Sequence, residues 1–201
     1  MKNKIISTLS IQKYGMFSTF FMALGLLLFA ADAQSQALYK IIPGSQIKVS
    51  GTSNLHDWNM IASTFSCEGN FKVKDGELLD ISSLSFSLPV TNLKSKEDLL
   101  NTRAYKALKA AEFSKITFKL KDATVMPQQK LRATGSLTIG GVTNEVVIMT
   151  SYAINSDETI TCKGSKAIKM SDHKIKAPSF MMGALKTGND VTIDILLKLK
   201  K

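Results

Sequence analysis

The stretch ELLDISSLSFSLPV (residues 77–90) decides the fold class. In its second half, serines alternate with the apolar residues Leu84, Phe86 and Leu88. A period of two puts the apolar side chains on one face of a β-strand and the serines on the other. The stretch follows Asp75-Gly76, a pair typical of a tight turn between antiparallel strands. It therefore predicts a half-buried antiparallel strand.

The same period recurs before and after this stretch, and turn signals separate the runs. With 77–90 as the third run, the others are SQIKVSGTS (45–53), 58–73, KITFKLKDATVM (115–126), KLRATGSLTIGG (130–141), NEVVIMTSYAI (144–154), ETITCKGSKAIKM (158–170) and DVTIDILLKLK (190–200). The last run places Val191, Ile193, Ile195 and Leu197 on the inward face. Residues 171–188 have no clear period and predict an irregular, partly helical segment.

One segment has a helical period instead. In SKEDLLNTRAYKALKAA (95–111) the apolar residues Leu100, Ala104, Leu108 and Ala111 recur every three or four positions. Ser95 and Asp98 fit a capping box at the start. The sequence therefore predicts one long helix between the third and fourth strands.

Eight antiparallel strands must hide their edges, either by closing into a barrel or by splitting into a sandwich. A helix inserted in mid-chain favours the barrel, where it would cover the mouth. We therefore predict an all-β fold, an eight-stranded antiparallel lipocalin-like barrel with one helix between strands 3 and 4. The interior of such a barrel is either filled by side chains or holds one small apolar ligand.

The N-terminus has the pattern of a secretory signal peptide. Lys2, Lys4 and Lys13 precede an uncharged run that ends at Ala31, and small residues stand at Ala31 and Ala33. We expect cleavage after Ala33, giving a signal peptide (1–33) and one mature domain (34–201) that is soluble in the periplasm or secreted. The alternative, a retained membrane helix, needs roughly 20 apolar residues, more than this run provides.

The charge and the cysteines point to no special chemistry. The formal net charge is +10, but lysines at alternate positions, as in Lys119 and Lys121, are typical of the water-facing side of a strand. No arginine cluster with interleaved aromatic residues indicates nucleic acid binding. Cys67 and Cys162 lack redox-motif spacing, and the sequence leaves open whether they form a disulfide or remain buried thiols.

The stretch SNLHDW (53–58) is the strongest candidate for a reactive site. His56 and Asp57 are adjacent, however, and neighbours on a strand point to opposite faces, so Asp57 is badly placed to orient the imidazole. His56 and His173 are the only histidines, and their spacing does not indicate a metal site. We predict no catalytic residue, no metal and no cofactor. The inward apolar face, with its methionines and aromatic residues, could instead hold a hydrocarbon chain or form an ordinary filled core.

Three stretches resemble a known family when taken in order: SNLHDW, LPVTNLKSKEDLLNTRAYKALKAAEFSKITFKL and GSLTIGGVTNEVVI. They are similar to the YceI-like, polyisoprenoid-binding family of exported bacterial proteins, and the similarity covers nearly all of the mature chain. The most specific part is the helix with Tyr105 and Leu108 leading into FSKITF. The resemblance implies a lipocalin-like barrel whose hydrophobic tunnel holds an isoprenoid chain such as a quinone or polyprenol, and it implies no reaction.

From this resemblance and the inward faces we expect non-enzymatic binding or carriage of an apolar lipid. The expected tunnel residues are His56, Trp58, Met60, Phe86, Leu88, Leu100, Tyr105, Leu108, Phe118, Met149 and Tyr152. The alternative is a stress-related interaction protein that keeps the same fold with an empty barrel. Whether the protein forms a homodimer through an exposed strand edge stays open.

In the predicted lipid-binding barrel, the stretch NLHDW forms a corner between the first two strands. Trp58 would pack at the barrel end, and Asp57 would tie down the turn. His56 would bond backbone groups there or meet a ligand head group.

Overall fold

The computed structural model describes residues 36–201, and the predicted signal peptide lies outside the described residues. No helix in the described part of the chain has the length and apolar character needed to cross a membrane.

The strands are β1 (Ala37–Ile41), β2 (Gln46–Ser53), β3 (Trp58–Ala62), β4 (Ser66–Lys74), β5 (Glu77–Pro89), β6 (Lys115–Met126), β7 (Lys130–Ile139), β8 (Val142–Ile154), β9 (Ile160–Lys169), β10 (Ser179–Phe180) and β11 (Leu185–Lys200). The helices are α2 (Asp98–Ala107) and the short 3₁₀ turns η2 (Val90–Asn92), η3 (Met170–His173) and η4 (Met181–Gly183).

Eight strands form a closed antiparallel ring in the order β1-β4-β5-β6-β7-β8-β9-β11. The ring closes where β1 pairs with β11, through Lys40 opposite Lys200 and Ile41 opposite Leu199. Strands β2 and β3 extend the wall from β11, and β10 pairs with β11 outside the ring. The predicted barrel is therefore confirmed, and the sandwich is excluded.

The first predicted strand (45–53) is present as β2, whereas the second (58–73) is divided into β3 and β4, and β1 precedes both as a strand that was not predicted. The chain leaves the sheet between β1 and β2 and again between β3 and β4, so that β1 pairs with β4 while β2 pairs with β3. The first break is fixed to β11: the Ser45 hydroxyl donates to the Ile42 carbonyl oxygen at 2.9 Å, and the Lys198 N–H donates to the Ser45 Oγ at 2.9 Å. The two short strands β1 and β2 therefore share the edge of β11, with β1 paired at its C-terminal end and β2 paired along the residues before it.

The predicted tight turn at Asp75-Gly76 is present, and a second turn of the same kind is formed by two glycines. Asp75-Gly76 joins β4 to β5 with φ of 51° and 78°, and Gly140-Gly141 joins β7 to β8 with φ of 55° and 79°. Two successive positive φ values match the twist of the flanking strands, which explains why these dipeptides occur here. The segment predicted to be irregular contains η3, β10 and η4.

The helix lies between β5 and β6 but is shorter than predicted. It begins at Asp98 and ends at Ala107, and its N-cap residue is Glu97, which makes no side-chain cap bond. The predicted capping box is therefore wrong. Instead, Asn101 folds back on Ser95: its Oδ1 accepts from the Ser95 N–H at 2.7 Å and its Nδ2 donates to the Ser95 carbonyl oxygen at 3.2 Å.

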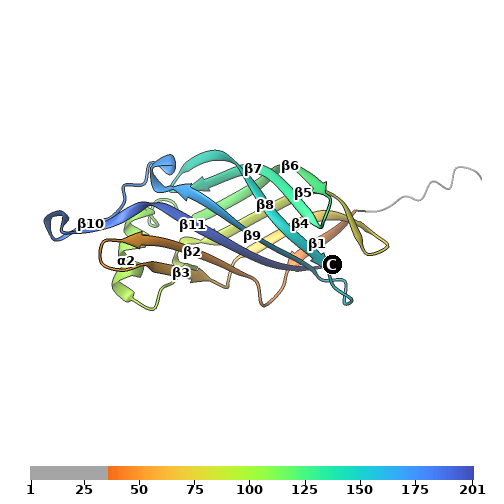
Figure 1. Ribbon diagram of the computed structural model, residues 1–201, viewed down its shortest axis with the longest axis horizontal. Helices are drawn as coiled ribbons and strands as arrows, with labels where there is room; N and C mark the ends of the chain where they lie inside the picture. The colour runs from red at the N-terminus through yellow and green to blue at the C-terminus, as the bar shows by residue number, and fades with distance from the viewer. Residues whose placement is uncertain (1–35) are drawn as a thin grey trace, which may run out of the picture. The chain divides into compact units, whose positions relative to one another are not determined.

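The barrel interior is filled near β1. A buried cluster there packs side chains from β1, β4, β5, β7, β9 and β11. Its members are Tyr39, Cys67, Phe71, Leu78, Ile81, Leu131, Ile160, Cys162 and Leu199. Figure 1 shows β1 at one end of the barrel, beside the C-terminus, and α2 at the opposite end. The packed cluster therefore forms a closed end of the barrel, opposite α2.

Candidate ligand-binding cavity

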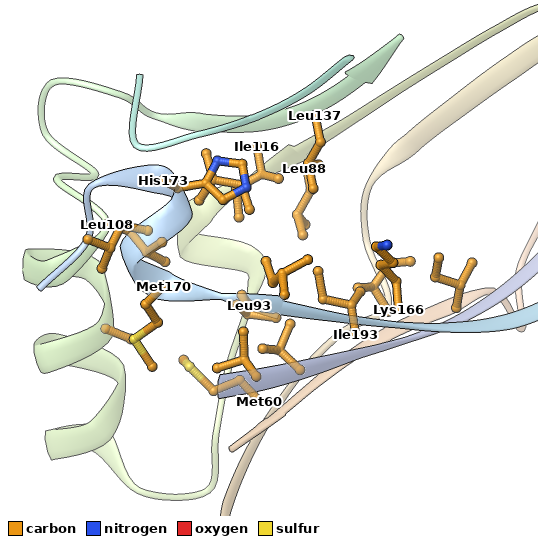
Figure 2. A pocket seen from close by; sticks show the side chains of 18 of the residues that line it. Met60, Leu88, Leu93, Leu108, Ile116, Leu137, Lys166, Met170, His173 and Ile193 are labelled. Atoms are coloured by element: carbon orange, nitrogen blue, oxygen red, sulfur yellow. The ribbon is translucent and has the colours of Figure 1, made fainter. Parts of the chain in front are cut away.

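A cavity of about 520 Å³ extends through the barrel from α2 to the closed end, where members of the packed cluster also line it. Its wall consists mainly of aliphatic and aromatic side chains, many of which are shown in Figure 2. The strands of the wall contribute Leu84, Phe86 and Leu88 from β5, Ile116 and Phe118 from β6, Ala133 and Leu137 from β7, and Val191, Ile193, Ile195 and Leu197 from β11.

The strand period explains this lining. Every second residue of β11 from Val191 to Leu197 faces the cavity, which confirms the inward face predicted for the last strand. Leu84, Phe86 and Leu88 of β5 face it in the same way. The residues between them point away, because successive side chains of a strand alternate between its two faces.

The helix covers part of the cavity with its apolar stripe. Leu100, Ala104 and Leu108 line the cavity, as the helical period predicted, whereas Ala111 lies beyond the end of α2 and is exposed. Beside this stripe, Leu55 and Leu99 also line the cavity and are largely exposed. The cavity therefore opens near α2 and the turn between β2 and β3.

The SNLHDW stretch forms that turn. The Ser53 hydroxyl accepts from the backbone N–H groups of Leu55 and His56, at 3.2 Å each, and donates to the His56 carbonyl oxygen at 2.8 Å. The His56 Nδ1 donates to the Asp57 carbonyl oxygen at 2.8 Å. The Asp57 carboxylate makes none of these bonds, so the expectation that Asp57 ties down the turn is wrong, and the Ser53 hydroxyl does so instead.

Trp58 lies at the same end of the barrel, as expected. Its ring lines the cavity, and its Nε1 donates to the Thr52 carbonyl oxygen at 3.1 Å. Trp58 pairs with Gly51 across β2 and β3, and a Cβ at Gly51 would lie 2.3 Å from the indole ring. The absence of a side chain at position 51 is therefore what allows the indole to lie flat against β2.

Most of the predicted tunnel residues meet at this cavity. Eight of the eleven line it: His56, Trp58, Met60, Phe86, Leu88, Leu100, Leu108 and Phe118. His56 lies at the exposed mouth, and Met60 and Leu88 are almost fully buried deeper inside.

The other three predicted residues do not line the cavity. Met149 is 43% exposed, on the outer face of β8, so its inward placement was wrong. Its neighbours Ile148 and Thr150 face inward, and since a strand alternates, Met149 and Tyr152 cannot share a face. Tyr152 faces inward but packs against the cluster at the closed end. The Tyr105 hydroxyl instead lies 3.0 Å from the carbonyl oxygens of both Thr91 and Leu93, and so holds α2 against the chain that follows β5.

Several polar groups in the lining escaped the sequence analysis. Lys166 faces the cavity from β9, and Thr150 faces it from β8 with a buried Oγ1 that has no hydrogen-bond partner. His173 is 2% exposed, and its Nδ1 donates to the Val142 carbonyl oxygen at 3.1 Å. Figure 2 shows Lys166 and His173 as the nitrogen-bearing side chains among the aliphatic and methionine side chains drawn. The sequence does indicate that Lys166 faces inward, because it lies an even number of positions from the apolar residues Cys162 and Ile168 along β9.

Comparison with known proteins identifies the domain. A family model described as the YceI-like domain matches residues 39–199, which is most of the chain. The chain belongs to the YceI-like family.

Solved structures share the fold of this YceI-like domain. BcnA of Burkholderia cenocepacia is 20% identical, with a TM-score of 0.62 over 76% of this chain and 95% of that one. A polyisoprenoid binding domain from Saccharophagus degradans, implicated in plant cell wall breakdown, is 14% identical, with a TM-score of 0.62 over 81% and 97%. The YceI protein of Campylobacter jejuni is 20% identical, with a TM-score of 0.52 over 66% and 84%. No curated protein matches the chain.

The two cysteines of this YceI-like domain are buried and unpaired within the closed-end cluster. Burial raises the pKa of both the Cys67 and the Cys162 thiol to about 12. Because the thiolate is the reactive form, burial and the raised pKa both suppress reaction with electrophiles.

We expect neither cysteine to react with a water-soluble maleimide at pH 8 while the protein is folded, and both to react after unfolding in guanidinium. Mass spectrometry of the labelled protein counts the adducts. An Ala153→Cys variant, with its thiol on the exposed face of β8, is the control that should label quickly in the folded state. Labelling of Cys67 or Cys162 at the rate of this control would contradict the burial.

Proposed function

We propose that this protein is an exported, non-enzymatic binding protein that carries or stores one apolar chain, such as an isoprenoid quinone or polyprenol. The observation that carries the proposal is the apolar cavity of about 520 Å³ inside a closed barrel of the YceI-like family. Pockets that bury small ligands measure roughly 300–1,000 Å³ and are mostly apolar with a few polar groups. The cavity has this size and this composition.

The character of the wall supports a flexible hydrocarbon ligand. Met60 and Met170 can adapt to an irregular chain, and Phe86, Phe118 and Trp58 offer aromatic surface. The Saccharophagus degradans relative is a polyisoprenoid binding domain with the same fold, which makes an isoprenoid the first candidate class.

A binding role rather than catalysis agrees with the polar groups at the mouth. The His56 ring donates to a backbone carbonyl oxygen instead of pairing with the adjacent Asp57 carboxylate. No group of three or more His, Cys, Asp or Glu side chains in residues 36–201 could hold a metal ion. Export rests on the N-terminal sequence pattern, with the mature domain beginning at Gln34 in the periplasm or outside the cell.

Native mass spectrometry of the protein purified from its own cells tests the proposal directly. We expect a mass increase that corresponds to about one bound molecule, and we expect organic extraction to release an apolar chain that can be identified. Protein denatured before analysis provides the control for nonspecific adducts. Repeated recovery of protein without any apolar molecule, from cells rich in quinone and polyprenol, would overturn the proposal and favour the alternative of an interaction protein.

A further inference from the structure

The barrel wall has a gap between β8 and β9. Pairing between these strands covers only Thr150–Ile154 with Ile160–Gly164. Beyond this point β8 remains paired with β7 down to Val142, and β9 remains paired with β11 up to Lys169. The two strands therefore separate while each keeps its other neighbour. We call the opening between residues 144–147 of β8 and 166–168 of β9 the side window.

The side window holds a recess of about 580 Å³ that adjoins the main cavity. Lys166, Ile168 and His173 line both the recess and the cavity, so these three side chains stand between the two spaces. The window is bounded at its far end, where the Asn144 Nδ2 donates to the Asp172 carbonyl oxygen at 2.7 Å and His173 is bonded to β8. The side window is therefore an opening bounded by hydrogen bonds at its far end, and not simply the place where two strands end.

Lys166 is the cation at the inner side of the window. It is half-buried, and its side chain has no ion pair or hydrogen bond with any residue from 36 to 201. Its neighbour in the β11 ladder is Ile193, and Ile148 and Ile168 are further apolar side chains of the same lining. Placing an ammonium group among apolar side chains without a counter-charge is unfavourable. An anion bound at this point would remove that cost.

A second polar residue lines the same part of the cavity. The Thr150 Oγ1 is buried without a partner, and Thr150 pairs with Gly164, two residues before Lys166 on the same face of β9. Residues two apart on a strand are separated by about 7 Å, so a small head group can lie between the two side chains. Because an ammonium only donates and a hydroxyl can also donate, both groups suit an acceptor-rich anion.

The acidic residues near the window are engaged elsewhere. Glu145 and Asp172 line the outer recess but not the main cavity. Glu145 accepts from the Lys121 Nζ at 2.6 Å, and the Asp172 Oδ2 accepts from the Lys169 N–H at 3.3 Å. An anion is therefore favoured on the inner side, next to Lys166, and disfavoured in the outer recess.

We propose that Lys166 and Thr150 form a head-group site for an amphipathic ligand with an anionic oxygen head, a carboxylate or a phosphate monoester. The Lys166 Nζ pairs with the anion, the Thr150 hydroxyl donates to it, and the hydrocarbon chain lies in the cavity. This inference rests on the proposed function, since it names the end of the ligand that the cavity would orient.

The test compares hexadecanoate, hexadecyl phosphate and hexadecanol, which share one chain and differ in the head group. Trp58 is the only tryptophan and lines the cavity, so its fluorescence reports binding. For the wild-type protein we expect at least one of the two anions to bind about tenfold more tightly than the alcohol. Lys166→Met should remove this preference, and Lys166→Arg should retain it. Lys163→Met, which removes an exposed lysine of the same strand, should leave it unchanged.

The outcomes separate the inference from the proposed function. Equal affinity for all three ligands in the wild-type and Lys166→Met proteins would overturn the head-group site and leave chain binding intact. Binding of none of the three, together with recovery of no apolar molecule from cells, would overturn the proposed function as well. If the preference is for one anion alone, the loss of that preference in Lys166→Met identifies the head group as carboxylate or phosphate.

Discussion

Replacing Ala133 with tryptophan is expected to lower the affinity for an apolar chain by about 100-fold, or ~2.7 kcal/mol. Ala133 lies on β7 and lines the cavity. Alanine to tryptophan is the largest increase in side-chain volume that one of the lining alanines allows, and the indole would occupy space that the chain needs. Titration of the protein with hexadecanol or a quinone, followed by calorimetry, measures the loss.

The matched control is Ala153→Trp, the same substitution on the exposed face of β8, which should bind as the wild-type does. Circular dichroism and thermal unfolding check that both variants fold. If Ala133→Trp fails to fold, Ala104→Trp makes the same obstruction from α2, where Ala104 also lines the cavity. A folded Ala133→Trp or Ala104→Trp protein with wild-type affinity would show that the chain does not occupy this cavity.

The strand period predicted the fold and much of the cavity because it is a local property. In β11 and the second half of β5 the alternation is unbroken, so the inward residues from Val191 to Leu197 and from Leu84 to Leu88 could be read directly. The closing contact between β1 and β11 joins residues about 160 positions apart in the chain, roughly Ile41 and Leu199. This closing contact has no local signal in the sequence and was predicted only from the tendency of a long sheet to hide its edges.

Alternation fails where a strand contains a bulge. The register between β4 and β5 shifts twice, between Asn70 and Phe71 and again between Lys72 and Val73. Each shift adds one residue to β5, so Leu78, Ile81 and Leu84 can all turn inward although their spacing is three. A fixed period of two would have placed Ile81 outside.

The error at Met149 has a different origin. The period of β8 is intact there, and Met149 lies an odd number of positions from Tyr152, so the two side chains point to opposite faces although both are apolar in character. Apolar character also fails as a guide at Lys166, whose parity along β9 placed it inside. A lysine on an apolar face is the kind of local conflict that is expected at functional sites.

Whether the barrel is hollow or filled could not be predicted from the sequence. The inward residues of both ends are of the same types, and the difference depends on how side chains from opposite walls meet. At the closed end, the Tyr39 and Phe71 rings pack at a centroid distance of 5.3 Å with a tilt of 56°. Such long-range contacts leave no periodic signal.

Replacing Phe71 with alanine is expected to lower the free energy of unfolding by about 3–5 kcal/mol. Phe71 is 1% exposed, contacts Tyr39 and lies in the cluster that fills the closed end. The substitution removes the buried ring and leaves a space that the surrounding strands, each held by ladders on both sides, cannot collapse to fill. Urea unfolding followed by circular dichroism measures the change at constant m-value. Since small domains are stable by about 5–15 kcal/mol, the loss is a large fraction of the total.

The control is Leu79→Ala, which truncates an apolar side chain of β5 that is 43% exposed and should cost no more than about 0.5 kcal/mol. Phe71 also lines the inner end of the cavity, so its removal should extend the cavity toward β1. We therefore expect Phe71→Ala, at a temperature where it is folded, to bind a longer alcohol better relative to hexadecanol than the wild-type does. A loss of stability below about 1 kcal/mol would contradict a packed closed end. An unchanged chain-length preference, with the full loss of stability, would show that another residue sets where the chain stops.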